Sequence, residues 1–249
     1  MSPLVLSSGR HVSPIQSGDP ALAGSHSKAG RGYTTTRLEP LRARCINIRM
    51  SLNEIAEALE LIPENYCVQL DTAAHFPSKA PLEVDVGCGD GSFLIRIATE
   101  NQGRNFLGIE RLLGRVRKTC RKAARAGLKN VKVLRLESSY AVRYLLPPKS
   151  VEVFHVMFPD PWPKRRHHER RLINNEFLDA VWNALVHGGE LRLTTDDLSY
   201  FQHMEKVVGL RKDFQVEPWD PGPNYPQTDF ERHFRAEGIK INRLLARKV

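Results

Sequence analysis

The sequence predicts an α/β fold built on a doubly wound, mostly parallel sheet of seven strands. From about residue 50 onward, strand-like apolar runs alternate with segments of helical period, which is typical of parallel sheets. A glycine-rich turn also follows an early strand, at the position where open α/β sheets bind ligands. Seven runs have the character of strands, namely residues 82–86, 106–109, 131–134, 151–158, 191–194, 214–216 and 239–245.

Segments of helical period lie before and between these strands. Residues 52–61 predict a short helix ahead of the sheet, and residues 93–98 and 112–126 predict two helices that each follow a strand. The second of these is expected to end at Gly127. A further helix is predicted where apolar residues recur at helical spacing and two glycines close the segment, at Phe177, Val181, Trp182, Leu185, Gly188 and Gly189.

The first 48 residues differ in composition from the remainder of the chain. They are rich in Ser, Gly and Arg and show no periodicity, which predicts a disordered, basic and Ser-rich extension over residues 1–48. A transit peptide and a translation start at Met50 are two other interpretations that the sequence leaves open. Residues 49–249 are therefore expected to form the folded domain.

The charge of the chain favours a polyanionic partner. Lys and Arg number 37 against 28 Asp and Glu, and neutralising phosphates with this excess of +9 would release counterions. A basic protein without such a partner is the other interpretation. No apolar stretch approaches the roughly 20 residues that span a bilayer, so no membrane association is expected. The four cysteines lack CxxC and zinc-ligand spacing, which predicts reduced thiols, a cytoplasmic location and no metal site.

A glycine loop follows the strand 82–86, in the segment Asp85-Val86-Gly87-Cys88-Gly89-Asp90-Gly91. Glycines let the backbone pass close to a ligand and adopt turns that other residues disfavour. The dinucleotide-binding fingerprint would place its third glycine at position 92, where this chain has Ser. The acidic Asp85 ahead of the loop suits a cationic or hydroxyl-bearing ligand better than a pyrophosphate. A tight turn without a ligand is the alternative interpretation.

Acidic residues recur at the ends of the next two strands. Glu110 lies roughly 20 residues after the loop, where a carboxylate can accept both hydroxyls of a ribose. Glu137-Ser138 follows the strand 131–134, where an adenine edge would lie. A single acid at a strand end is commonly just solvated. Three of them beside a glycine loop predict a site for a nucleoside-bearing cofactor.

The segment Phe158-Pro159-Asp160-Pro161-Trp162-Pro163-Lys164 comes at the end of the strongly apolar run 151–158. Its prolines restrict the backbone and are expected to hold Asp160 and Trp162 in a rigid turn. This turn would lie at the carboxyl edge of the sheet and face the same crevice as the glycine loop. Such rigid placement is what a catalytic site needs.

Two basic segments accompany these features. A charge run is usually a solvated face, but the run from Lys164 to Arg171 begins at the predicted reaction site, which favours contacts with phosphates. The second lies on the helix 112–126, where a solvated amphipathic face is the favoured interpretation and RNA contact the alternative. Its cations, at three- and four-residue steps, are Arg111, Arg115, Lys118, Lys122 and Arg125, opposite the apolar Leu112, Val116, Cys120 and Ala123.

Together these residues resemble the bacterial tRNA (guanine-N7-)-methyltransferase family, whose fold is Rossmann-like. The resemblance covers about residue 80 to the C-terminus and also includes Arg170-Arg171, Thr195-Asp196 and Thr228-Asp229-Phe230-Glu231. It implies transfer of a methyl group from S-adenosylmethionine to N7 of a guanine in the variable loop of tRNA, with S-adenosylhomocysteine as the product. Monomer and homodimer both remain open.

The resemblance also implies roles for individual residues. The cofactor would be bound by Asp85, Gly87, Gly89, Glu110, Glu137, Ser138 and Asp160, and Asp160 would also be the catalytic residue. The substrate would be bound by Lys164, Asp196, Thr228, Asp229, Phe230 and Glu231. Glu231 has a second interpretation, in which it pairs with Arg232 or Arg235 and only orders its loop.

The chemistry of guanine N7 fits a site without a strong base. N7 has an in-plane lone pair and no proton, so methylation needs alignment and tolerance of the developing positive charge. Asp160 is expected to accept hydrogen bonds from the Watson–Crick edge of the guanine, and thereby to orient N7. Three alternatives remain at this point: a methyltransferase for exocyclic amines, a nicotinamide-dependent oxidoreductase, and a non-catalytic RNA-binding protein on the same scaffold.

Overall fold

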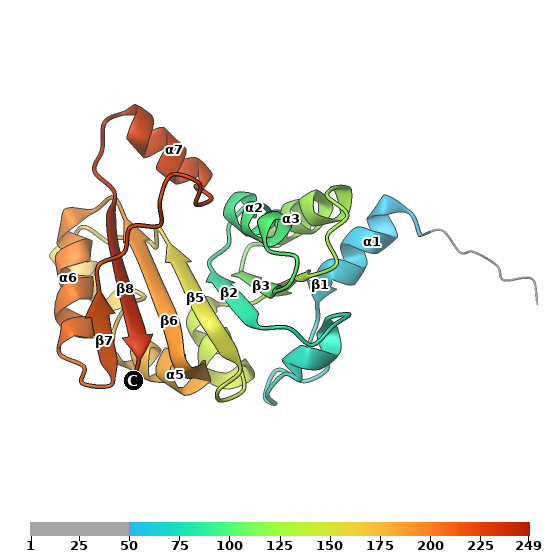
Figure 1. Cartoon of the computed structure of the whole chain (residues 1–249), viewed down its shortest axis with the longest axis horizontal. Coiled ribbons are helices and arrows are strands. Elements are labelled where there is room, and N and C mark those ends of the chain that lie inside the picture. Colours follow the sequence, from blue (N-terminus) through green and yellow to red (C-terminus); the bar gives the residue numbers. More distant parts are fainter. Residues whose placement is uncertain (1–49) are drawn as a thin grey trace, which may run out of the picture. The chain divides into compact units, whose positions relative to one another are not determined.

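The computed structural model describes residues 50–249, which contain an eight-stranded sheet of order β1-β4-β3-β2-β5-β6-β8-β7 (Figure 1). The predicted extension over residues 1–48 lies outside the described residues. The strands are β1 (Glu60–Leu61), β2 (Leu82–Val86), β3 (Asn105–Glu110), β4 (Val131–Arg135), β5 (Val151–Met157), β6 (Leu185–Thr195), β7 (Phe214–Glu217) and β8 (Asn242–Lys248).

The predicted mostly parallel sheet is confirmed. Every pairing among β1 to β6 is parallel, whereas β8 runs antiparallel to both of its neighbours, β6 and β7. The sheet has eight strands rather than seven because Glu60 and Leu61 pair with Val133 and Leu134 at its edge. The helix predicted over 52–61 therefore ends two residues early, at Leu59.

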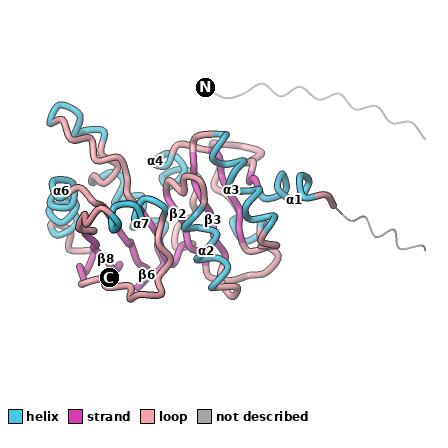
Figure 2. The backbone as a smooth tube through the Cα atoms, turned by 90° about the horizontal axis from the view of Figure 1, so that it is seen from above, coloured by secondary structure: helices cyan, strands magenta, loops and turns pink. Residues whose placement is uncertain are grey.

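Helices lie on both sides of the sheet (Figure 2). The α-helices are α1 (Leu52–Leu59), α2 (Ser92–Glu100), α3 (Leu113–Arg125), α4 (Ser138–Tyr140), α5 (Asn175–Ala184), α6 (Leu198–Gly209) and α7 (Asp229–Ala236). Two 3₁₀ turns, η1 (Thr72–His75) and η3 (Arg165–Arg170), and one π-helical turn, η2 (Ala141–Leu145), complete the set. The sequence patterns predicted α1, α2, α3 and α5 but not α6 or α7.

The two faces of the sheet carry separate hydrophobic clusters. α1, α2 and α3 pack on one face, where Val131 and Val133 of β4 belong to their cluster. η2, α5 and α6 pack on the other face, together with Leu134 of the same strand. This alternation follows from the period of two of a β-strand. It covers both faces, as a doubly wound sheet requires.

Two glycines occupy a different place from the predicted one. Gly188 and Gly189 do not close a helix, because α5 already ends at Ala184 and both glycines lie within β6. The register of β6 against β5 shifts between the pairs Val151↔Leu185 and Val153↔Glu190. Gly188 has a φ of +74°, which lets the strand accommodate this irregularity.

The last strand also lies later than predicted, at Asn242–Lys248 instead of 239–245. Residues 238 and 239, which were predicted to begin or precede this strand, form the C-terminal end of α7. Gly238 has a φ of +74° and its N–H donates to the carbonyl of Arg235, while the N–H of Ile239 donates to the carbonyl of Phe234 at 2.8 Å. Residues 238 and 239 therefore belong to the helix terminus.

The strand order reverses between β2 and β5, which are adjacent and parallel. Open α/β sheets bind ligands at such a switch point, outside the carboxyl ends of the strands. β2, β3, β4, β5 and β6 all end at this edge because they are parallel neighbours. Separately, we find among residues 50–249 no helix with the length and apolar character needed to cross a membrane.

Candidate active site

The glycine loop connects β2 to α2 at the switch point. Gly87, Gly89 and Gly91 have φ values of +75°, +59° and +76°, a region that L side chains rarely adopt. A Cβ added at Gly91 would lie 2.4 Å from Cγ2 of Thr119 in α3. The loop is therefore in close contact with α3, and glycine is required there for its conformation and for the space.

Asp85 lies on β2 directly before this loop and is only 3% exposed. Its Oδ2 is buried and has no hydrogen-bond partner within the described part of the chain. Burial, together with the nearby carboxylate of Glu110, raises the pKa of Asp85 to about 7. The ionised form of this carboxyl therefore lacks a compensating group, which a cationic or hydrogen-bond-donating ligand would provide.

The other two predicted cofactor acids are oriented by backbone amides. Glu110 ends β3 in a buried position, and its Oε1 accepts a hydrogen bond from the N–H of Leu112 at 2.8 Å. Glu137 precedes α4 and accepts from the N–H groups of Ser139 and Tyr140 at 3.0 and 2.8 Å. A carboxylate has more acceptor positions than these contacts use, so both remain able to accept further donors.

Asp90 is a charged residue of the loop to which the sequence patterns gave no role. Its Oδ2 accepts hydrogen bonds from Lys122 and Lys118 of α3, with Nζ–Oδ2 distances of 2.7 and 3.0 Å. Burial alone would raise the pKa of this carboxyl, but the two lysines hold the pKa of Asp90 well below its usual range. Asp90 is thus ionised, and it joins the glycine loop to α3.

The segment from Phe158 to Lys164 leaves β5 in an unusual backbone conformation. Phe158 and Trp162 have φ values of +54° and +45°, although neither is glycine. The predicted strand 151–158 therefore ends one residue early, and the N–H of Phe158 donates to the carbonyl of Thr194 at 2.8 Å. Asp160 is exposed between these two residues. Strained residues of this kind persist only where the surroundings hold them, commonly at functional sites.

Arg171 provides much of that support, whereas the sequence placed it in a basic run and among the residues of the family resemblance without a role of its own. It is 3% exposed, and its Nε donates to the carbonyl of Pro161 at 2.9 Å. One Nη donates to Oγ of Ser199 at 3.3 Å, and the guanidinium lies 4.8 Å from the ring centroid of Tyr200. We find no carboxylate paired with Arg171 among residues 50–249. A buried cation therefore fixes the turn that carries Asp160.

Trp162 is supported by the basic run that follows it. The ring of His167 meets the indole edge-on with 5.8 Å between centroids. The guanidinium of Arg170 lies over the indole at 5.2 Å from its centroid. Because both partners come from η3, this turn orders the segment around Trp162 while the remaining cations of η3 stay exposed.

α7 presents the second predicted substrate segment. Thr228 begins the helix, and its hydroxyl accepts from the N–H of Glu231 at 2.9 Å. The carboxylate of Glu231 is buried and forms ion pairs with Arg235, at 2.8 Å, and with Arg243 of β8. Glu231 therefore ties α7 to the sheet.

Asp229 and Phe230, which lie between Thr228 and Glu231, are exposed. Asp229 pairs with Arg232, and the ion pair expected between Glu231 and one of two arginines forms with Arg235. Phe230 stacks on Phe234, with 6.2 Å between ring centroids, and Phe234 in turn lies 5.6 Å from Phe158. This row of aromatic rings connects α7 to the turn that carries Asp160.

The remaining predicted residues lie on segments that leave the same edge of the sheet. Ser138 begins α4 after β4, Lys164 is exposed ahead of η3, and Asp196 is half-buried directly after β6. The carboxyl edge of β2 to β6 therefore carries the predicted cofactor acids, Asp160 and Asp196, and α7 joins this edge through its contact with Phe158.

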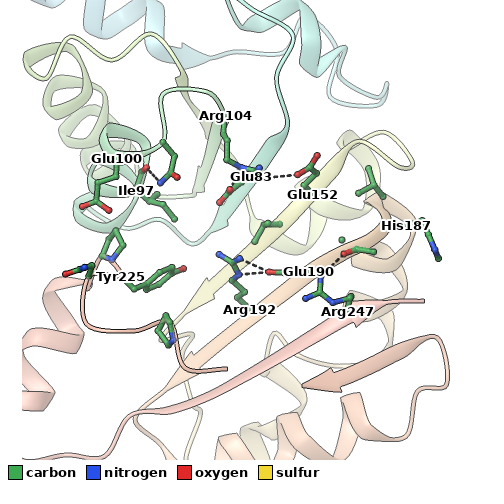
Figure 3. A pocket seen from close by; sticks show the side chains of 18 residues that line it. Glu83, Ile97, Glu100, Arg104, Glu152, His187, Glu190, Arg192, Tyr225 and Arg247 are labelled. Carbon is green, nitrogen blue, oxygen red and sulfur yellow. Dashed lines mark hydrogen bonds and ion pairs between the residues drawn. The ribbon is translucent and has the colours of Figure 1, made fainter. Parts of the chain in front are cut away.

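A cavity of about 700 Å³ lies elsewhere, against the beginnings of β5 and β6 (Figure 3). None of the predicted site residues lines it. The arginines that line it have carboxylate partners, since Arg104 pairs with Glu83 and Glu152, and Arg192 pairs with Glu190. The positive charges of this cavity are therefore compensated by carboxylates of the protein itself.

A buried hydrogen-bonded chain crosses from this cavity to the segment before α7. His155 of β5 contacts Glu83 of β2 through Nε2, at 2.7 Å, and Nδ1 lies 3.1 Å from the hydroxyl of Tyr225. Burial lowers the pKa of His155, so its neutral form is favoured. With Nε2 donating to the carboxylate, Nδ1 is left to accept from Tyr225. The chain thus anchors the segment that leads to Thr228.

The chain is similar in sequence to known proteins. The family described as putative methyltransferase matches residues 79–244. The tRNA (guanine-N(7)-)-methyltransferase of Halorhodospira halophila is 37% identical over 193 residues, covering 75% of this chain and 82% of that protein. The protein of the same name from Syntrophotalea carbinolica is 33% identical over 193 residues, covering 76% and 83%.

Solved structures resemble the fold at lower sequence identity. The antibiotic-resistance methyltransferase Kmr superposes with a TM-score of 0.50 at 18% identity, covering 76% of this chain and 94% of that one. The 16S rRNA methyltransferase KamB gives 0.51 at 17%, covering 68% and 87%. These likenesses confirm the predicted Rossmann-like methyltransferase fold. The matched family and the two relatives named here are methyltransferases, which favours this activity over the nicotinamide-dependent alternative.

Proposed function

The chain belongs to the tRNA (guanine-N(7)-)-methyltransferase family, and from this premise we propose that it transfers a methyl group from S-adenosylmethionine to N7 of a guanine in the variable loop of tRNA. One observation carries the proposal. The strained turn with Asp160 and the glycine loop leave adjacent parallel strands, β5 and β2, at the switch point of the sheet. A methyl donor beside the loop and a base beside the turn would therefore lie next to each other.

The residues of the β2–β4 half fit S-adenosylmethionine. This cofactor supplies an electrophilic methyl group on a cationic sulfonium, and it also carries an ammonium group, a ribose and an adenine. The unpartnered Oδ2 of Asp85 suits the cationic part, and the loop at Gly87 and Gly89 allows close approach of the backbone. Glu110 keeps acceptor capacity for the ribose hydroxyls, and Glu137 with Ser138 would meet the adenine edge.

The reaction requires the protein to align guanine N7 with the methyl group. Guanine N7 attacks through an in-plane lone pair, so no proton has to leave before the new bond forms. Asp160 would accept hydrogen bonds from the N–H groups of the guanine Watson–Crick edge and so fix the direction of N7. Its negative charge also stabilises the positive charge that develops on the purine. Asp160 is thus an orienting and charge-stabilising group in this proposal.

The residues around Asp160 support such a role. Arg171 and the aromatic ring of Tyr200 hold the turn from the protein side, which keeps the carboxylate preorganised. On the open side, Lys164 and the exposed cations of η3 would contact phosphates. Asp196, Thr228 and the exposed Asp229 and Phe230 would border the base, while Glu231 holds α7 in position.

The identity of the methylated atom is the decisive test. We would incubate the full chain with S-adenosylmethionine and an unmodified tRNA transcript, digest the RNA with nucleases and identify the nucleosides by mass spectrometry. The matched control is a transcript made with 7-deazaguanosine, which has a carbon in place of N7 but keeps every exocyclic amine. We expect 7-methylguanosine from the first transcript and no methylated guanosine from the second.

Other products would contradict the proposal in distinguishable ways. An N²-methylguanosine or N⁶-methyladenosine product that persists with the 7-deaza transcript would identify an exocyclic-amine methyltransferase. RNA binding without any methyl transfer, while S-adenosylhomocysteine still stabilises the protein against heat, would identify a non-catalytic protein on this scaffold.

A further inference from the structure

The outer face of α3 carries positive charge without any compensating acid in the helix. Six of its 13 residues are Lys or Arg, and none is Asp or Glu. The inner face is apolar and buried, with Val116, Cys120 and Ala123 packed in the core as predicted. The predicted inner residue Leu112 is instead 45% exposed, because it caps the helix rather than lying within it.

Some of these cations have structural partners. Lys118 and Lys122 hold Asp90 of the glycine loop, and Arg115 lies 3.8 Å from the carboxylate of Glu110. Three others, which we call the arginine row, have no carboxylate partner among residues 50–249: Arg117, Arg121 and Arg125. All three are exposed, and Nε of Arg121 donates only to the backbone carbonyl of Arg117.

A purely structural role does not account for the arginine row. Its members are spaced four residues apart, so they are neighbours along one line of the helix, and like charges at this spacing destabilise a helix. The helix dipole favours cations only in the last turn, which explains Arg125 but neither Arg117 nor Arg121. A solvated face would gain stability from Glu at such positions, and the helix contains none.

The position of α3 relates the arginine row to the reaction site. The helix begins three residues after Glu110, at the carboxyl edge of the sheet, and Asp90 fixes it to the glycine loop. On the other side of the glycine loop, the segment after β5 carries the exposed cations of η3. The reaction edge is thus flanked by two cationic surfaces, and an RNA molecule with its phosphates would extend over both.

We propose that the arginine row binds the sugar-phosphate backbone of the substrate RNA at a distance from the methylated base. This inference rests on the proposed function for the identity of the RNA. The contact is electrostatic and independent of sequence, so it contributes affinity rather than choice of base. An anionic membrane is disfavoured as the occupant because a surface helix inserts an apolar face, and that of α3 is already buried in the core.

The test compares two triple variants of the full chain with equal loss of charge. The first replaces the arginine row: Arg117→Gln, Arg121→Gln and Arg125→Gln. The control removes three exposed cations elsewhere: Lys79→Gln, Lys206→Gln and Lys212→Gln. Binding of an unmodified tRNA transcript is measured by fluorescence anisotropy between low and moderate salt, together with the kcat of methyl transfer at saturating tRNA and the melting temperature.

For the first variant we expect the slope of log K against log salt to become shallower by about 2 to 3, and the affinity near physiological salt to fall on the order of tenfold. The kcat and the binding of S-adenosylhomocysteine should match the control, and the melting temperature should equal or exceed that of the control, because repulsion between like charges along the row is relieved. A slope and affinity equal to those of the control overturn the proposal. So does a lower melting temperature with unchanged RNA binding, because that outcome identifies a structural role.

Two further outcomes are separable. If wild-type protein sediments with phosphatidylserine vesicles and only this property is lost in the first variant, the partner of the row is a membrane and the proposal fails. If the wild type methylates no tRNA, the proposed function fails. The arginine row is still judged by the two salt slopes, which require binding alone.

Discussion

Two buried carboxylates in different halves of the molecule have opposite surroundings. Asp85, in the half formed by β2 to β4, is 3% exposed and one of its oxygens has no partner among the described residues. Glu231, in the half formed by β5 to β8 and α7, is also 3% exposed, but Arg235 and Arg243 both pair with it. Burial is equal, so the difference lies in what compensates the charge.

The presence or absence of a partner distinguishes buried carboxylates that hold elements together from buried carboxylates that can bind a ligand. A buried charge without a partner is unfavourable, and it persists where a bound ligand completes the site. A buried charge with two partners holds elements together and leaves little for a ligand. On this basis we expect a ligand to contact Asp85, whereas Glu231 positions α7 and leaves its neighbours Asp229 and Phe230 exposed.

The largest effect is expected at Asp160, which is exposed where the two halves meet. In Asp160→Ala the group that orients the guanine and offsets its charge is lost, so kcat should fall by about 10²- to 10³-fold. Single-turnover kinetics on tRNA measure this change. The control Glu205→Ala removes an exposed carboxylate of α6 and should leave kcat unchanged. A kcat for Asp160→Ala within twofold of wild type would refute the assigned role.

Glu231 and Asp229 provide a sharper test within one helix. Glu231→Gln leaves Arg243, whose side chain is 13% exposed, without its carboxylate, and should destabilise α7 by about 3 kcal/mol. Asp229→Asn disrupts an exposed pair with Arg232 and should cost less than about 1 kcal/mol. Amide hydrogen exchange in α7 measures both changes. Equal protection in the two variants would mean that the buried pair does not anchor the helix.

Local patterns predicted the half formed by β2 to β4 well. The strand–glycine loop–helix unit around Gly87 and the acid at Glu110 depend on neighbours in sequence, and the structure has them where the patterns indicate. The errors arise where a residue has two compatible uses. Gly188 suits a helix terminus and a bulge equally, and the pairing with β5 decides between them. Leu112 fits an apolar helical face but falls at the cap.

The half formed by β5 to β8 and α7 was less predictable, because contacts between residues that are distant in sequence build it. Arg171 reads as one more cation in a basic run, and its role appears only when it contacts Pro161 and lies against Tyr200 of α6. In the sequence, Arg243 is only one residue of the final strand, whereas in the structure β8 places it beside Glu231. Positive φ at Trp162 likewise has no sequence signal beyond the flanking prolines.

A substitution at Arg171 tests whether methyl transfer depends on the contacts that hold the turn with Asp160. Arg171→Lys keeps the charge but cannot reproduce the planar set of donors that contacts Pro161 and Ser199 together. We expect kcat to fall on the order of tenfold, equivalent to about 1.4 kcal/mol, with the KM for S-adenosylmethionine unchanged. The control Arg96→Lys alters an exposed arginine of α2 and should match wild type. A change in the KM for S-adenosylmethionine alone would instead place the effect in the half formed by β2 to β4.

The smallest effect concerns protonation of Asp85, whose pKa is raised to about 7 in the free protein. Below this pH the carboxyl holds a proton that a cationic ligand must displace, so affinity falls as the pH decreases. Affinity for S-adenosylmethionine should therefore drop about threefold between pH 7.5 and pH 6.5, measured by calorimetry in buffers of different ionisation enthalpy. Asp85→Asn should bind more weakly and lose this dependence. If wild-type affinity is constant over the same range, Asp85 is already ionised without the ligand, and its missing partner is supplied by solvent instead.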